Sequence, residues 1–266
     1  MHNPPRSTRV AAVQLCAGPD LEANLTTTAK LVAEAGAQGA EVVMVPEAFA
    51  FLGPEKVKRE LLEPLPNEPA GAAGPILERC REMARAQACD LILGGFHEDC
   101  GDPEKCFNTC IHLAPDGRIK ATYRKIHLFD VALADGTQLR ESARTLAGDQ
   151  VVTTDLAFGK LGLSVCYDLR FPYLYQRLVD QGAVALTVPS AFTATTGAAH
   201  WHVLLRARAI ECQCYVIAPA QHGHNWGKRY SYGHSLIIDP WGEIVAEQAE
   251  GDGVVVAEID PEQVQK

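Results

Sequence analysis

The chain has 266 residues, of which 24 are Lys or Arg and 33 are Asp or Glu, so its formal net charge at pH 7 is −9. This acidity argues against a protein that binds nucleic acid or an anionic membrane through a basic face. No apolar run approaches the roughly 18 residues that a transmembrane helix needs, and residues 1–8 do not resemble a secretory signal. With 47% hydrophobic residues, we expect a soluble, globular, cytoplasmic protein.

The first half of the chain alternates short apolar strands with longer helices. Strands are predicted over residues 10–15, 42–46 and 91–96, and helices over residues 21–37 and 75–85. Asp20 is placed to cap the first helix, because its carboxylate can accept a hydrogen bond from a free backbone N–H of the first turn. A hairpin over residues 109–122 turns at Pro115-Asp116-Gly117.

The second half repeats this order. Strands are predicted over residues 162–166, 185–189 and 215–219, helices over residues 171–181 and 201–212, and a hairpin over residues 234–247. The Thr-rich stretch at residues 190–197 is predicted as a loop. Because no linker separates the two halves, the pattern indicates one α/β domain in which each half is a sheet covered by helices.

The nine cysteines do not suggest a disulfide framework, because their number is odd and the chain is long. A zinc site is the alternative for the cluster of His97, Cys100, Cys106, Cys110 and His112. However, its spacings differ from the paired CxxC knuckles of structural zinc sites. We therefore expect no metal, and most of the cysteines to be small buried hydrophobic residues.

Three ionisable residues directly follow or interrupt apolar segments. Glu47 follows a strand of four apolar residues and a proline, Cys166 ends another strand, and Lys125 follows the first hairpin. In α/β sheets, ligands bind beyond the strand ends, so such residues are site candidates. Each alone has a plainer interpretation: a loop glutamate, a solvated lysine and a core cysteine.

Taken together, the three blocks resemble the nitrilase, or carbon–nitrogen hydrolase, superfamily. The blocks are Pro-Glu at residues 46–47, Tyr-Arg-Lys-Ile-His-Leu-Phe at residues 123–129, and the segment 162–172, which contains Cys-Tyr-Asp-Leu-Arg-Phe-Pro. The resemblance covers residues 8–260 and implies one carbon–nitrogen hydrolase domain, an α/β fold built as a four-layer α-β-β-α sandwich of two similar halves. It also implies that Glu47, Lys125 and Cys166 form a catalytic trio, with Glu141 as a second glutamate.

The chemistry of these residue types fits amide hydrolysis. We expect a Cys166 thiolate as nucleophile, with its pKa lowered by the cationic Lys125. Lys125 and the backbone N–H of Tyr167 would stabilise the oxyanion, and Glu47 would act as general base and acid. Glu141 would hold Lys125 in place, unless it is an ordinary surface carboxylate. No cofactor is expected, because no phosphate-binding loop or metalloprotease motif occurs.

The segments at residues 199–216 and 231–242 resemble the Nit branch of the superfamily. This resemblance implies an α-keto amide substrate, with deaminated glutathione, which yields 2-oxoglutarate and cysteinylglycine, as the first choice. The ω-amidase substrate 2-oxoglutaramate is the alternative, followed by N-carbamoyl amino acids and nitriles. A catalytically silent binding module is a different possibility, although such proteins usually lose one of the trio. By analogy with the family, we expect a homodimer or homotetramer.

Either keto-amide carries a carboxylate, which needs a fixed cation in the site. Arg170, four residues after Cys166, is the candidate, with a salt bridge to Asp168 as the alternative. Thr196 is a candidate donor to the same carboxylate. Lys228 and Arg229 are either a second cationic patch or, as we expect, simply solvated.

Overall fold

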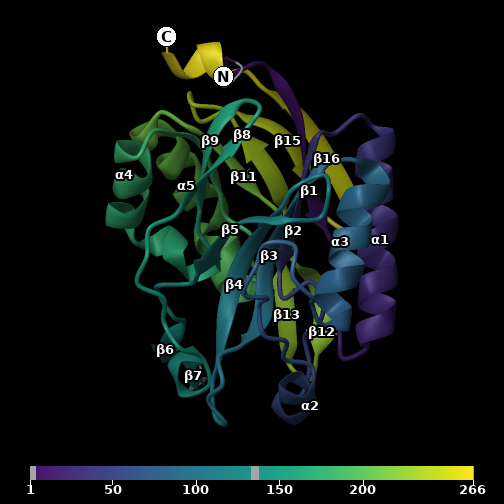
Figure 1. Ribbon diagram of the computed structural model, residues 1–266. Helices are drawn as coiled ribbons and strands as arrows, with labels where there is room; N and C mark the ends of the chain where they lie inside the picture. Colours follow the sequence, from purple (N-terminus) through teal and green to yellow (C-terminus); the bar gives the residue numbers. More distant parts are fainter. Residues whose placement is uncertain (1–3, 133–137, 266) are drawn as a thin grey trace.

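The computed structural model describes residues 4–132 and 138–265, and contains two six-stranded sheets packed face to face (Figure 1). The first sheet has the order β16-β1-β2-β3-β4-β5 and the second the order β15-β14-β11-β10-β9-β8. The strands of the first sheet are β1 (Thr8–Gln14), β2 (Val42–Glu47), β3 (Asp90–Asp99), β4 (Cys106–Leu113), β5 (Ile119–Arg124) and β16 (Gly253–Ile259). Those of the second are β8 (Thr153–Leu156), β9 (Gly159–Leu163), β10 (Ala183–Thr187), β11 (Tyr215–Ala218), β14 (Ser235–Ile238) and β15 (Ile244–Gln248).

Helices cover the outer faces of both sheets (Figure 1). The first sheet carries α1 (Leu21–Ala37) and α3 (Pro75–Gln87), and the second carries α4 (Pro172–Asp180) and α5 (Ala194–Cys212). Smaller elements are the helix α2 (Glu55–Glu60) and two ribbons, β6 (Asp130–Ala132) with β7 (Gln138–Arg140) and β12 (His222–Trp226) with β13 (Arg229–Tyr232). The predicted α-β-β-α sandwich is therefore confirmed. None of the helices in the described part of the chain is both long and apolar enough to cross a lipid bilayer.

The alternation of side chains along the strands builds the layers. In β1, Val10 and Ala12 pack in the core between the two sheets, whereas Ala11 and Val13 pack in the core beneath α1 and α3. Because successive side chains of a strand point to opposite faces, a strand buried on both faces must be apolar throughout. This explains why the strands read as continuous apolar runs.

The two halves share one connectivity, as the sequence predicts. In the first, β1, β2 and β3 are parallel and the β4–β5 hairpin continues the sheet. In the second, β9, β10 and β11 are parallel and the β14–β15 hairpin continues it. The carboxyl ends of β2 and β10 lie where the halves meet, because the N–H of Ala191, which follows β10, donates to the carboxylate of Glu47 at the end of β2.

Two helix starts differ in how well the sequence predicted them. The Asp20 carboxylate accepts a hydrogen bond from the N–H of Ala23 (3.0 Å), so the predicted cap of α1 is confirmed. The Thr-rich segment, however, is not a loop throughout: Thr193 caps α5, and residues 194–197 form its first turn. This turn lacks the apolar periodicity that signals a helix. Gly197 leaves no room for a side chain there, because a Cβ would lie 2.3 Å from Tyr232 Cβ.

Candidate active site

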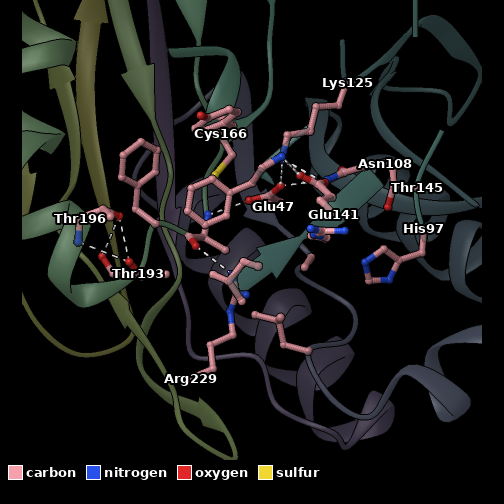
Figure 2. A pocket seen from close by; sticks show the side chains of 18 of the residues that line it. Glu47, His97, Asn108, Lys125, Glu141, Thr145, Cys166, Thr193, Thr196 and Arg229 are labelled. Carbon is pink, nitrogen blue, oxygen red and sulfur yellow. Dashed lines mark hydrogen bonds and ion pairs between the residues drawn. The ribbon is translucent and has the colours of Figure 1, made fainter. Parts of the chain in front are cut away.

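A cavity of about 290 Å³ lies at the junction of the two halves (Figure 2). Both halves contribute to its wall. The lining includes four of the predicted site residues, namely Glu47, Lys125, Glu141 and Cys166. The structure therefore brings together side chains that come from four separate segments of the chain.

Glu47 is the last residue of β2 and its carboxylate is almost fully buried. One oxygen, Oε1, accepts hydrogen bonds from Asn108 Nδ2 (2.8 Å) and Lys125 Nζ (3.0 Å), and Oε2 accepts one from the N–H of Ala191 (2.9 Å). Burial alone would raise the pKa of Glu47, but the Lys125 ammonium and these hydrogen bonds, with one from Cys166, hold it well below its ordinary value. The carboxylate is thus ionised and fixed in orientation.

Lys125 follows β5 and is 2% exposed. Its ammonium lies between two carboxylates, donating to Glu47 Oε1 (3.0 Å) and to Glu141 Oε2 (2.9 Å). Although burial disfavours the charged form, the two glutamates raise the pKa of Lys125 well above its ordinary value. Glu141 is itself held by the N–H of Phe129 (2.7 Å). Lys125 is therefore a fixed cation rather than a proton donor.

Cys166 occupies a tight turn after β9. Its φ angle is +51°, a left-handed conformation that is uncommon for residues other than glycine. Buried Asp168 holds this turn, because its Oδ2 accepts hydrogen bonds from the N–H of Val165 (2.9 Å) and from Tyr123 Oη (2.7 Å). Ala48, directly after Glu47, has a φ of +56°. Strained backbone thus adjoins both groups, as it often does at functional sites.

The expected Cys166 thiolate is wrong for the free protein. Burial raises the pKa of the Cys166 thiol, and the negative charge of Glu47 raises it further, while Lys125 only partly opposes them. The sequence indicated the cation but not that a buried carboxylate would lie equally close. The geometry therefore holds a neutral thiol beside an ionised carboxylate.

Two further polar groups were not predicted from the sequence, and a third was singled out only for a zinc site. Asn108 bridges the glutamates, because its Nδ2 donates to Glu47 and also to Glu141 Oε1 (3.3 Å). The backbone N–H of Ala191 is the second, and His97, a member of the zinc alternative, lies in the cavity wall. Burial, with the nearby Lys58 ammonium, lowers the pKa of His97 to about 3. The sequence did not single out Asn108, because β4 contains two other polar residues, Thr109 and His112.

The two proposed substrate anchors, Arg170 and Thr196, both line the cavity. The Arg170 guanidinium contacts His200 Nδ1 (3.2 Å) and lies 5.6 Å from the centre of the Phe192 ring. The alternative of a salt bridge to Asp168 is wrong, because Asp168 binds His127 Nδ1 (2.7 Å) and the turn described above. Thr196 Oγ1 lies 2.9 Å from Thr193 Oγ1.

The expectation that Lys228 and Arg229 are both solvated holds for only one of them. Lys228 is exposed, whereas Arg229 is half-buried and lines the cavity. The tight turn at Gly227 (φ +58°) separates β12 from β13 and directs the two side chains differently. Two neighbouring cations in a sequence gave no indication of this difference.

The suspected zinc cluster is dispersed. Cys110 packs in the core between the sheets, and His112 binds Asp90 Oδ1 and Thr154 Oγ1, both at 2.8 Å. In the described residues, the group with metal-ligand geometry lies elsewhere, at His202, His234 and Glu247. There, one Glu247 oxygen is already bonded to both imidazoles.

Comparisons with known proteins agree with this architecture. A family model described as carbon-nitrogen hydrolase matches residues 9–266. The chain is 46% identical over 260 residues to a deaminated glutathione amidase of Synechocystis sp., covering 96% of this chain and 93% of the relative. The crystal structure of the Caenorhabditis elegans NitFhit protein superposes with a TM-score of 0.90 at 39% identity, covering 99% of this chain but only 63% of that one. Saccharomyces cerevisiae Nit3, a member of branch 10 of the nitrilase superfamily, superposes with a TM-score of 0.84 at 33% identity, covering 98% of this chain and 92% of that one.

Proposed function

The chain belongs to the carbon–nitrogen hydrolase family, and on that premise we propose that it is an amidase that hydrolyses deaminated glutathione to 2-oxoglutarate and cysteinylglycine. The observation that carries the proposal is the meeting of Glu47, Lys125 and Cys166 in one cavity. The name of the Synechocystis relative supports the substrate. The reaction passes through a thioester on Cys166.

Substrate binding comes first. The α-keto acid end of the substrate carries a carboxylate, for which the Arg170 guanidinium provides a planar, bidentate partner. The Thr196 hydroxyl donates to the same carboxylate. Anchoring this end places the amide carbonyl, a few atoms away, against the sulfur of Cys166.

Acylation then requires a base, because the Cys166 thiol is neutral in the free protein. Glu47 takes the thiol proton as sulfur attacks the carbonyl carbon, and the electron pair of the C=O bond moves to oxygen. Lys125 and the N–H of Tyr167 stabilise this oxyanion. When the oxyanion collapses, the C–N bond breaks, Glu47 protonates the departing nitrogen, and cysteinylglycine leaves the thioester behind.

Hydrolysis of the thioester restores the site. Glu47, again ionised, takes a proton from water as the water oxygen attacks the thioester carbonyl. The second oxyanion collapses, the C–S bond breaks, and the proton held by Glu47 returns to sulfur. Glu141 and Asn108 act as positioning residues, since they hold Lys125 and Glu47 at fixed distances through both steps.

The test is a comparison of kcat/KM for deaminated glutathione and 2-oxoglutaramate, measured with the same protein preparation. We expect deaminated glutathione to be preferred. A preference of about tenfold or more for 2-oxoglutaramate, which amounts to about 1.4 kcal/mol in the transition state, would instead identify an ω-amidase. Carbon dioxide release from an N-carbamoyl amino acid at a higher kcat/KM would identify a carbamoyl hydrolase.

We also propose that residues 8–260 form one catalytic domain, and that the chain assembles as a homodimer or homotetramer through helical faces. Val203 and Ile210 lie exposed on α5, and Trp241, 82% exposed, directly precedes Gly242, which lies close to Ile210. Exposed apolar patches of this kind favour association. Light scattering measures the oligomeric state of the wild type and of Val203→Asp.

The nine unpaired cysteines favour a reducing compartment such as the cytoplasm.

A further inference from the structure

We propose that Arg229 binds the terminal carboxylate of the leaving dipeptide, and thereby selects deaminated glutathione over smaller keto-amides. This inference rests on the proposed function and concerns the half of the substrate that departs. The binding step involves only an ion pair with hydrogen bonds, and no covalent change.

The contacts of Arg229 leave its charge unbalanced. Its Nη2 donates to the carbonyl oxygen of Ala191 (2.9 Å), while its Nε is buried without a hydrogen-bond partner in the described residues. None of the carboxylates that the structure describes forms an ion pair with it. A buried guanidinium N–H without an acceptor is costly, so the position favours an anionic ligand that supplies one.

Two other cations of the cavity already have acidic partners. Lys125 is held by two glutamates, as described above, and Lys58 lies 2.8 Å from Glu55 Oε2. Arg140, Arg170 and Arg229 line the cavity with no ion-paired carboxylate among the described residues, and of these Arg229 is the one that Ala191 joins to Glu47. Deaminated glutathione carries two carboxylates, one at its keto-acid end and one at its glycine. If Arg170 binds the first, Arg229 is available for the second.

The position of Arg229 relative to Glu47 fits the leaving side of the site. A single residue, Ala191, joins them: its N–H binds the Glu47 carboxylate (2.9 Å) and its carbonyl oxygen binds the guanidinium (2.9 Å). Glu47 is the group that protonates the departing nitrogen, so that nitrogen lies on its side of the sulfur. Two extended residues span about 7 Å, which is the reach of cysteinylglycine from the scissile bond.

The two arginines enter the cavity from different elements. Arg229 reaches it from β13, which pairs with Thr193, and Glu47, Lys125 and Cys166 lie farther along the cavity (Figure 2). Arg170 belongs to the turn that begins at Cys166, so a substrate with an anionic group at each end has one cation for each. By contrast, 2-oxoglutaramate loses only ammonia and has no group that reaches Arg229. The chain's net charge of −9 makes such local cations necessary for a dianionic substrate.

The experiment compares Arg229→Met and Arg229→Lys with wild type on two pairs of substrates. The first pair is deaminated glutathione and 2-oxoglutaramate. The second pair is deaminated glutathione and its derivative with the glycine carboxylate converted to a carboxamide. Lys228→Met removes the same charge from the neighbouring, exposed position and serves as the matched control.

We expect Arg229→Met to lower the kcat/KM preference for deaminated glutathione over 2-oxoglutaramate by about tenfold or more, chiefly through KM. Arg229→Lys should retain part of the preference, and Lys228→Met nearly all of it. Conversion of the glycine carboxylate to a carboxamide should lower kcat/KM of the wild type by about tenfold and that of Arg229→Met far less. This difference is expected if the carboxylate and Arg229 interact directly, because their effects are then not additive.

Two results would overturn the inference. If Arg229→Met lowers kcat/KM equally for all substrates, Arg229 only holds the Ala191 carbonyl. If the carboxamide penalty is the same in wild type and variant, the carboxylate binds elsewhere; in both cases the proposed amidase function stands. A wild type that hydrolyses no deaminated glutathione would contradict that function and this inference together.

Discussion

The two halves of the molecule have the same strand order, yet only one junction between their strand ends carries the candidate site. The sequence Val-Pro-Glu-Ala-Phe ends β2 at residues 45–49, and Val-Pro-Ser-Ala-Phe follows β10 at residues 188–192. Glu47 and Ser190 therefore occupy corresponding places. Ser190 Oγ donates only to the carbonyl oxygen of Val188 (3.0 Å), whereas Glu47 faces Lys125.

The cysteines correspond in the same way. Cys16 follows β1 as Cys166 follows β9, but the β12–β13 ribbon closes the end at Cys16. Asn225 of that ribbon donates to the carbonyl oxygen of Ala17 (3.0 Å), and the N–H of Cys16 donates to Asp252 Oδ1 (3.0 Å). Burial and Asp252 raise the pKa of Cys16 with no opposing cation, whereas Lys125 opposes the shift at Cys166. The backbone alone thus does not make the site, and the placement of a cation and an open cavity does.

The largest effect expected from this comparison is on the two cysteines. Cys166→Ala removes the nucleophile and should lower kcat by about 10,000-fold or more, while Cys16→Ala should leave it within about twofold of wild type, since surface substitutions away from the site have small effects. Release of cysteinylglycine in a stopped assay measures both. Near-normal turnover by Cys166→Ala would remove the thioester mechanism.

The second effect is on the corresponding strand-end residues. Because the Cys166 thiol is neutral, Glu47→Gln should block its deprotonation and lower kcat about 100- to 10,000-fold, and intact-mass spectrometry should find no acyl-enzyme. Ser190→Ala removes one buried hydrogen bond, and we expect a loss of about 1 kcal/mol in the free energy of unfolding. Accumulation of a thioester in Glu47→Gln would show that another group deprotonates the thiol.

Much of this comparison was visible in the sequence. The apolar strands, the capped α1 and both hairpins depend on local signals, namely apolar runs, Asp20 and turn residues, and the structure confirms that they form. The predicted strand ends are less exact: β9 ends at Leu163 and not at Cys166, which lies in the turn that follows. The proximity of Glu47, Lys125 and Cys166 was predicted only through the resemblance of three blocks to one family. Their roles in catalysis stay predictions.

The remaining features depend on contacts between distant segments. Strand β16 pairs with β1 through seven residue pairs, from Thr8 with Ile259 to Gln14 with Gly253, and no local pattern indicates such a partner. The position of Arg229 depends on how the β12–β13 ribbon packs against both halves, through Ala17 of the first and Ala191 of the second. The neutral Cys166 thiol depends on burial and on the sum of two opposed charges, and neither quantity can be read from residue order.

The third prediction concerns the contact between the halves at the open end. A Cβ at Gly94 would lie 2.3 Å from Pro189 Cβ and 2.3 Å from the carbonyl oxygen of Val45. Gly94→Ala must therefore push β3 away from β2 and from the segment at Pro189, and we expect the free energy of unfolding to fall by about 3 kcal/mol. At the closed end, a Cβ at Gly18 would lie 3.3 Å from the carbonyl oxygen of Asn225, so Gly18→Ala should have a much smaller effect. Urea denaturation measures both, and equal losses would mean that the two ends are packed alike.

The smallest expected effect is on the pH dependence of stability, and it concerns the histidines near the closed end and in the open cavity. His222, near the closed end, lies 2.9 Å from Asp252 Oδ1, whereas His97 in the open cavity has no carboxylate partner in the described residues. Burial and Lys58 lower the pKa of His97 from 6.5 to about 3, so between these values the unfolded chain binds one proton more than the folded protein. Stability therefore falls as the pH drops below 6.5.

Between pH 7.5 and 5.5, His97 should account for a loss of about 1 kcal/mol in the free energy of unfolding. His97→Gln should remove that part of the pH dependence, because glutamine does not titrate. Lys58→Met should remove a smaller part, because burial, the larger cause of the shift, persists. Denaturation curves for the wild type and the two variants at both pH values measure this change. If the free energy of unfolding of His97→Gln changed with pH as much as that of the wild type, His97 would be protonated inside the cavity. The open end would then carry one more cation than the comparison assigns to it.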